Sequence, residues 1–176
     1  MTIVPDTKDW TWVLQRPCPE CGFDTQSFAV QAVPDMITSN AAAWQQLLTG
    51  RGDLRGRPAP GKWAPVEYGC HVRDVFRLYD QRLELMLTVD DPLFPNWDQD
   101  ATAVADRSQD QDPAEVAAAL SEAGRALGGR FASVTGGQWQ RTGRRSDGAS
   151  FTVETFARYF IHDPVHHLYD VTGQPR

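Results

Sequence analysis

Apolar side chains recur at steps of three and four residues in four segments of the chain. This spacing places them on one face of a helix. The segments are residues 27–48, 65–88, 113–134 and 152–171. No segment shows the sustained alternation of apolar and polar residues that marks a half-buried strand. The pattern therefore predicts an all-α protein, an antiparallel four-helix bundle in which pockets form between facing helices.

Prolines and one aspartate mark helix ends. Pro65 stands at a first helical position, where its missing N–H costs nothing, and Asp112 before Pro113 is an N-cap signal for the third helix. Pro34 indicates a kink or a late start of the first helix. Pro164 lies inside the last one, where proline costs about 3 kcal/mol unless other contacts compensate, and it predicts a local kink.

The segments outside the helices differ in character. Residues 1–26 are rich in Pro, Trp and Cys without a sustained period, so we interpret them as an irregular N-terminal arm. Residues 27–176 form one domain, the bundle. Residues 89–111 are long and acidic, which is typical of a functional lid or of a crossover between distant helix ends. The connection before the last helix is turn-rich, with a short extended piece expected around Trp139.

Composition and charge narrow the function. The chain has 176 residues, 41% apolar and 23% charged, and a formal net charge of −6. The acidic balance argues against nucleic acid as a partner. There is no apolar run long enough for a membrane helix and no signal peptide, so we expect a cytoplasmic protein with no membrane partner. Three cysteines are too few for a secreted disulfide framework.

Three of the four histidines lie between residues 160 and 170. His162 and His166 are four residues apart and share a helix face, the spacing by which two imidazoles chelate one divalent metal. His71, on the second helix, is the remaining candidate for a third ligand, since His167 points about 100° away from that face. The alternative is that the histidines are hydrogen-bonded packing residues.

Carboxylates accompany these histidines at helical spacing. Glu67 precedes His71 by four residues, Asp74 follows it by three, and Asp170 follows His166 by four. Such groups orient metal-bound imidazoles, and Glu67 and Asp170 are our candidates for a catalytic general base, ahead of His167. The alternative for Glu67 is a favourable charge in the first turn of its helix, and for Asp74 an ion pair on the solvated face.

Two stretches of the sequence resemble the signature of a known family. "KWAPVEYGCHVRD" at residues 62–74, followed by "YFIHDPVHHLYD" at 159–170, is similar to the signature of the DinB/YfiT-like metalloenzyme superfamily. The resemblance covers roughly residues 27–172. It implies a four-helix bundle with a long crossover between the second and third helices, and a divalent metal, usually zinc or nickel. By motif position, the resemblance implies that His71, His162 and His166 hold this metal.

The resemblance also implies a class of reaction. Relatives close to the mycothiol-dependent maleylpyruvate isomerases and the bacillithiol transferases use the metal to activate a low-molecular-weight thiol, which attacks an electrophile. We therefore expect a thiol S-transferase of the mycothiol type, or a related isomerase or hydrolase, with a small-molecule thiol and an electrophile as partners. Other hypotheses are a non-catalytic metal-binding stress or regulatory protein, a bundle that forms a homodimer face, and a vestigial site.

The stretch "CPECG" departs from the family's pattern. Cys18 and Cys21 form a Cys-x-x-Cys pair, which supplies two zinc ligands where a structural site needs four. Three interpretations stay open: a redox dithiol, half of a zinc site between two subunits, and a turn whose sulfurs merely pack. Cys70, next to His71, is expected to be a small buried residue that faces away from the metal.

Overall fold

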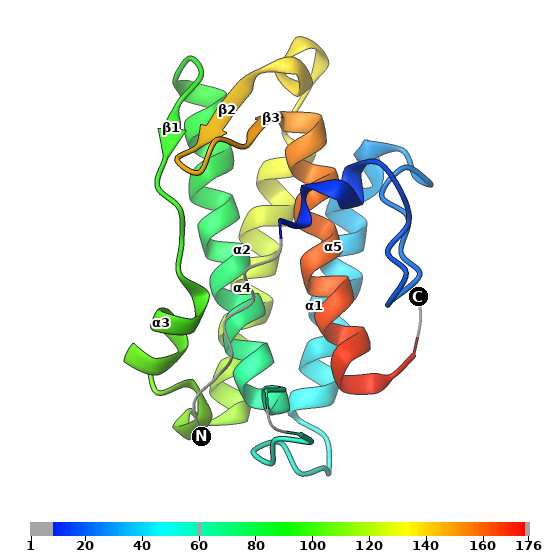
Figure 1. Ribbon diagram of the computed structural model, residues 1–176, viewed down its shortest axis with the longest axis vertical. Helices are drawn as coiled ribbons and strands as arrows, with labels where there is room; N and C mark the ends of the chain where they lie inside the picture. Colours follow the sequence, from blue (N-terminus) through cyan, green and yellow to red (C-terminus); the bar gives the residue numbers. More distant parts are fainter. Residues whose placement is uncertain (1–8, 60, 175–176) are drawn as a thin grey trace.

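Four long helices form the body of the molecule (Figure 1). The computed structural model describes residues 9–59 and 61–174. Helix α4 packs on both α1 and α2, and α5 contacts the same two helices. The predicted all-α bundle is confirmed, and its helices are α1 (Val33–Leu48), α2 (Pro65–Thr88), α4 (Pro113–Ala132) and α5 (Val153–Thr172).

The helix starts follow the signals in the sequence. Asp112 accepts hydrogen bonds from the backbone N–H groups of Ala114 and Glu115 at 2.9 and 3.1 Å, just ahead of Pro113. Helix α1 begins late, because Pro34 occupies its first turn and a short 3₁₀ helix, Val30–Ala32, precedes it. The Asp112 cap satisfies N–H groups that a helix leaves unpaired at its start.

Close approach of α4 to its neighbours depends on one glycine. A Cβ atom at Gly124 would lie 3.1 Å from the Cβ of Ala41 and 3.1 Å from the ring of Phe76. A side chain there would push α4 away from α1 and α2. The core around this contact is aromatic and aliphatic, and its largest fully buried side chains include Trp44, Phe76, Phe131, Phe156, Phe160, Leu83 and Leu120.

The crossover between α2 and α4 carries short elements and runs along the outside of α2 (Figure 1). It contains β1 (Leu93–Phe94), α3 (Gln99–Ala105) and a 3₁₀ helix, Ser108–Asp110. The long crossover is therefore confirmed. Among the described residues, no helix is long and apolar enough to cross a membrane.

A small sheet caps one end of the bundle, although the sequence pattern predicted no strands. Its order is β1-β2-β3, with β2 (Thr142–Arg145) parallel to β1 and antiparallel to β3 (Ser150–Thr152). Strands of two to four residues are too short for an alternating pattern to appear. The extended piece expected around Trp139 was also misplaced, because Trp139 lies in a 3₁₀ helix, Gly136–Gln140.

The N-terminal arm lies against α5 (Figure 1). Its first described element is a 3₁₀ helix, Trp10–Leu14. Arg158 of α5 donates hydrogen bonds to the carbonyls of Thr25 and Phe28 at 2.7 and 3.0 Å. Within the arm, the buried hydroxyl of Thr25 donates to the carbonyl of Val13 at 2.6 Å. The arm is thus an ordered wall on the outer side of α5.

We expect Thr25→Val to lower the free energy of unfolding by about 1–3 kcal/mol, because the carbonyl of Val13 would lose its partner in a buried place. Thr38→Val is the matched control, since the hydroxyl of this exposed residue also donates to a backbone carbonyl, that of Pro34. Urea denaturation of both variants measures the difference. Equal losses in the two variants would contradict a role of Thr25 in anchoring the arm.

Candidate metal centre

Helix α5 carries two overlapping pairs of ligand residues. His162 and His166 are four residues apart, and so are Asp163 and His167. The second pair is displaced by one residue, which turns it by about 100° around the helix. The two pairs therefore face different neighbours, and among the described residues each pair belongs to a separate group of potential metal ligands.

Asp163 and His167 face α2, where they meet His71. His71 Nε2 lies 3.3 Å from Oδ1 and 3.4 Å from Oδ2 of Asp163, and His167 Nε2 lies 3.7 Å from Oδ2. The ligand atoms of the three residues all lie within 4.8 Å of one another. The rings of His71 and His167 are 4.8 Å apart and nearly perpendicular. Two helices thus bring two imidazoles and one carboxylate to a common point.

A carboxylate and aromatic rings fix the two imidazoles. Nδ1 of His167 donates to Asp170 Oδ2 at 3.1 Å, which leaves Nε2 with its lone pair directed to the group. The ring of Trp97 stacks on His71 at 5.5 Å, and Tyr68 packs on His167 at 5.0 Å. Asp170 and these rings hold the imidazoles in the orientation that ligation requires.

The electrostatics keep the carboxylate ionised. Burial alone would raise the pKa of Asp163, but His71 and His167 outweigh that effect and hold it well below its usual value. Burial likewise opposes the effect of His167 on Asp170, whose pKa is nevertheless lowered. Both side chains are therefore carboxylates at neutral pH, Asp163 as a ligand and Asp170 as a hydrogen-bond acceptor.

The donor set fits a divalent metal. Buried side-chain atoms without a hydrogen-bond partner among the described residues include Asp163 Oδ1 and His71 Nδ1, so these residues leave the group incompletely satisfied. Two neutral imidazoles and one carboxylate suit Zn²⁺, Fe²⁺ or Ni²⁺. Three protein ligands leave coordination positions open, as catalytic sites require.

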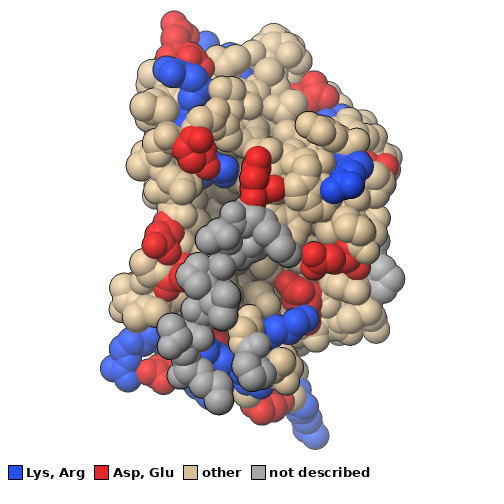
Figure 2. Space-filling model, in the orientation of Figure 1, with Lys and Arg blue, Asp and Glu red and all other residues tan. Residues whose placement is uncertain are grey.

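A large cleft of about 1080 Å³ opens beside this group. Asp163, His167 and Asp170 line it from α5, and Trp97 lines it from the crossover. Its other walls come from the arm, the sheet end and the start of α2. The acidic residues that line it are Asp9, Glu20, Asp98, Asp100, Asp147, Asp163 and Asp170, against Lys62 and Arg145 as the basic ones. Figure 2 shows Asp and Glu side chains spread around the centre of the face that it presents.

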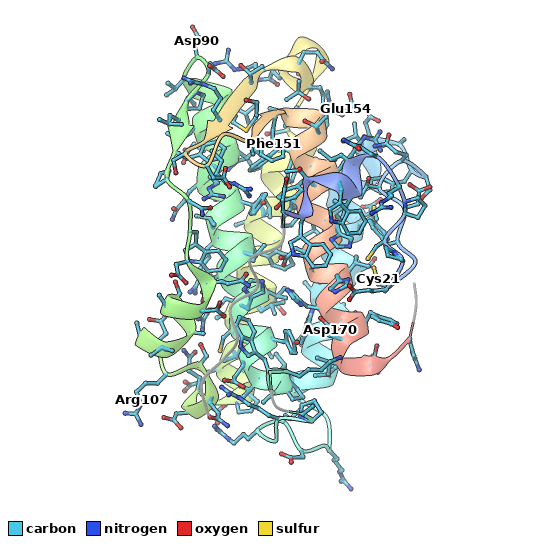
Figure 3. The ribbon with its side chains drawn as sticks, viewed as in Figure 1. Cys21, Asp90, Arg107, Phe151, Glu154 and Asp170 are labelled. Atoms are coloured by element: carbon cyan, nitrogen blue, oxygen red, sulfur yellow. The ribbon has the colours of Figure 1, made fainter. Side chains whose placement is uncertain are left out.

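His162 and His166 face the arm, where they meet Cys18 and Cys21. Burial lowers the pKa of His162 to about 4 and also lowers that of His166, so both imidazoles are neutral near pH 7. Burial raises the pKa of the Cys21 thiol to about 11 in the absence of a metal. Figure 3 shows Cys21 where the arm passes α5.

The structure thus divides the predicted ligand set of His71, His162 and His166. His162 and His166 lie together, as their spacing predicts, but His71 belongs to the group with Asp163 and His167. Because the two pairs on α5 are offset by one residue, periodicity alone could not tell which pair faces α2. The signal that could have found the second pair was present, since Asp163 and His167 also stand four residues apart. Ligation itself stays a prediction for every one of these residues.

The predicted general bases also differ in their placement. Asp170 lines the cleft and contacts His167. Glu67 is buried at the start of α2, accepts from the backbone N–H of Ala64 at 2.8 Å and pairs with Arg57 through two hydrogen bonds. It is not among the residues that line the cleft. These contacts favour the alternative reading of Glu67 as a residue that fixes the helix start.

Comparisons with known proteins place the fold. A family model described as the DinB superfamily matches residues 36–171. A solved structure described as "YfiT from Bacillus subtilis is a probable metal-dependent hydrolase with an unusual four-helix bundle topology" is 19% identical, with a TM-score of 0.76 over 84% of this chain and 88% of that one. Among curated proteins, none matches.

We expect Glu67→Gln to lower the free energy of unfolding by about 1–3 kcal/mol, because the buried charged partner of Arg57 is lost. Metal content should not change. Glu84→Gln is the control, since Glu84 lies on the same helix, is more than half exposed and lies near Arg130. A Glu67 variant that unfolds like the control but loses activity would restore Glu67 as a catalytic residue.

Proposed function

Because the chain belongs to the DinB superfamily, we propose that it is a metal-dependent enzyme that holds a divalent ion with His71, Asp163 and His167. The convergence of these three side chains beside a large cleft carries the proposal. A divalent ion bound there lowers the pKa of a coordinated water or thiol and polarises an electrophile. With two neutral imidazoles and one carboxylate, the centre keeps a net positive charge, which favours an anionic nucleophile.

The chain's own residues orient the reactants. Asp170 fixes the tautomer and the ring plane of His167, and it is the candidate to take a proton from a nucleophile at the open side of the cleft. Trp63 and Trp97 pack on the ring of His71 and shield it from water. Shielding strengthens every electrostatic interaction at the centre.

The charge of the cleft limits the substrate. Among the residues that the structure describes, seven acidic and two basic ones line it, so repulsion disfavours substrates with several negative charges. Arg145 contacts Asp147 and Tyr159 at 2.7 and 3.3 Å, so its charge offsets that of Asp147 and the other acidic residues stay in excess. We therefore propose a thiol S-transferase that accepts an uncharged thiol of the mycothiol type, with an uncharged or cationic electrophile. Hydrolysis by activated water at the same centre is the related alternative.

The non-catalytic alternative makes a different prediction about the cleft. A metal-binding stress or regulatory protein has no need of an open cavity beside its ion, and a closed, fully coordinated centre would serve it better. The cleft beside Asp163 and His167 supports the catalytic proposal. Retention of metal without turnover of any thiol or hydrolysable ester would favour the non-catalytic protein.

We expect Asp163→Asn to reduce turnover more than about 100-fold, since the neutral amide is a poor metal ligand. The assay offers mycothiol, glutathione, bacillithiol and cysteine with a generic electrophile, and measures thiol consumption by the metal-loaded protein. Asp100→Asn is the matched control, because Asp100 lines the same cleft from α3 and belongs to neither ligand group. Equal activity of the two variants would contradict the proposed centre.

Asp170→Asn should weaken Ni²⁺ binding at the same centre by about 10–100-fold, because the acceptor of the His167 N–H loses the negative charge that raises the basicity of the imidazole. Competition with a metallochromic chelator measures the affinity. The control is again Asp100→Asn. Unchanged affinity in the Asp170 variant would contradict the supporting role of Asp170 at the centre.

A further inference from the structure

Four ligand residues that the proposed reaction does not use meet between the arm and α5. Sγ of Cys18 lies 3.7 Å from Nδ1 of His166, and Sγ of Cys21 lies 3.8 Å from Nε2 of His162. The four ligand atoms all lie within 4.8 Å of one another, and the two cysteines are not joined by a disulfide. Figure 3 shows Cys21 at this contact, above Asp170.

These distances match a tetrahedral zinc site. Zinc binds thiolate sulfur at about 2.3 Å and imidazole nitrogen at about 2.0–2.1 Å, which places neighbouring sulfur and nitrogen ligands about 3.6 Å apart at the tetrahedral angle. Both sulfur–nitrogen separations lie within about 0.2 Å of that value. Two sulfurs and two nitrogens are also a donor set that selects zinc over harder cations.

The backbone explains how each pair of ligands forms a clamp. The arm turns tightly at Cys18–Gly22, where the N–H of Gly22 donates to the carbonyl of Cys18 at 2.8 Å and the N–H of Cys18 donates to the carbonyl of Phe23 at 2.9 Å. Gly22 has a φ of +75°, a conformation that glycine adopts without strain. This turn brings both sulfurs to one side, and the helical spacing of His162 and His166 does the same for the nitrogens.

The burial and the charge of the four groups suit a bound zinc ion. Cys18 and Cys21 are 1% exposed, and His162 and His166 are only 4% and 6% exposed. Two thiolates cancel the charge of Zn²⁺, so the complete site is neutral and suits a buried place. The second nitrogen of His166 lies 3.7 Å from carboxylate oxygens of Glu20 and Asp170, the kind of partner that metal-bound histidines have.

We propose that Cys18, Cys21, His162 and His166 bind one zinc ion in a closed tetrahedral site that fastens the N-terminal arm to α5. All four ligands are protein side chains, so the ion has no open position and a structural role. The ring of Trp10 packs on both imidazoles, at 5.5 and 5.2 Å, and Trp10 also lines the cleft. Zinc at this place therefore holds one wall of the cleft, whatever reaction the cleft supports.

The test uses the full chain carrying His71→Ala, which removes a ligand of the proposed catalytic centre and keeps this site intact. We expect the purified variant to retain one zinc per chain by elemental analysis. After exchange with Co²⁺, it should show the intense visible bands of a tetrahedral ion and the near-ultraviolet charge-transfer band of thiolate ligands. Neither readout depends on activity, so failure of this proposal is distinct from failure of the proposed function.

Cysteine variants locate the ligands. Cys18→Ser or Cys21→Ser in the same background should abolish the thiolate band, lower the melting temperature and expose the arm to limited proteolysis. Cys70→Ser is the matched control, because Cys70 is also a buried thiol but contacts the carbonyl of Ser108 and belongs to neither group. If a cysteine variant fails to fold, the Co²⁺ spectrum of the His71→Ala protein still decides.

Three outcomes would overturn the proposal. The His71→Ala protein could contain no zinc, its Co²⁺ spectrum could lack thiolate bands, or Cys18 and Cys21 could form a disulfide in the freshly purified protein with no loss of melting temperature on chelation. The last result would restore the redox dithiol as the role of the pair.

Discussion

The orientation of α5 about its own axis is the constraint on which the site depends. The helix is buried on one side against α1 and α2 and covered on another by the arm. Its two ligand pairs are offset by one position in the sequence. The rotation of the helix about its axis therefore sets the direction of both pairs. When Asp163 and His167 point to His71 on α2, His162 and His166 must point to the cysteines of the arm. The orientation of α5 that forms the group with His71 therefore also forms the group with the cysteines.

The two groups divide the chemistry by their ligands and their surroundings. Two histidines and a carboxylate beside a cleft leave coordination positions for a reactant, whereas two cysteines and two histidines would fill a tetrahedral ion's positions, although His162 and His166 also line the cleft. Trp10 links the groups, because it lies on the imidazoles of one and lines the cleft of the other. In this arrangement the arm belongs to the architecture of the cleft as well as to its own metal site.

Sequence patterns predicted the bundle well, since its helices carry long apolar stripes and clear caps such as Asp112. They predicted that the histidines on α5 lie close together, and they singled out Asp170 near them. They could not decide which pair meets His71, because the two pairs are offset by one residue and the buried apolar residues Ile161 and Val165 stand on the same stretch of helix. The sheet was missed because its strands are shorter than a detectable alternation.

The role of the Cys-x-x-Cys stretch was undecidable from spacing alone. Cys18 and Cys21 supply half of a zinc site, and their partners stand more than 140 residues later in the chain. Only the three-dimensional path of the arm shows that His162 and His166 complete the set. The sequence predicted that His162 and His166 share a metal with His71. Their position beside the two cysteines therefore bears on both the role of the cysteines and the partners of His71.

Anomalous diffraction at the zinc edge, from crystals of the zinc-loaded protein, tests the central claim most directly. One peak is expected among His71, Asp163 and His167, and a second among Cys18, Cys21, His162 and His166. A single peak shared by His71, His162 and His166, or no peak next to Asp163, would contradict that claim.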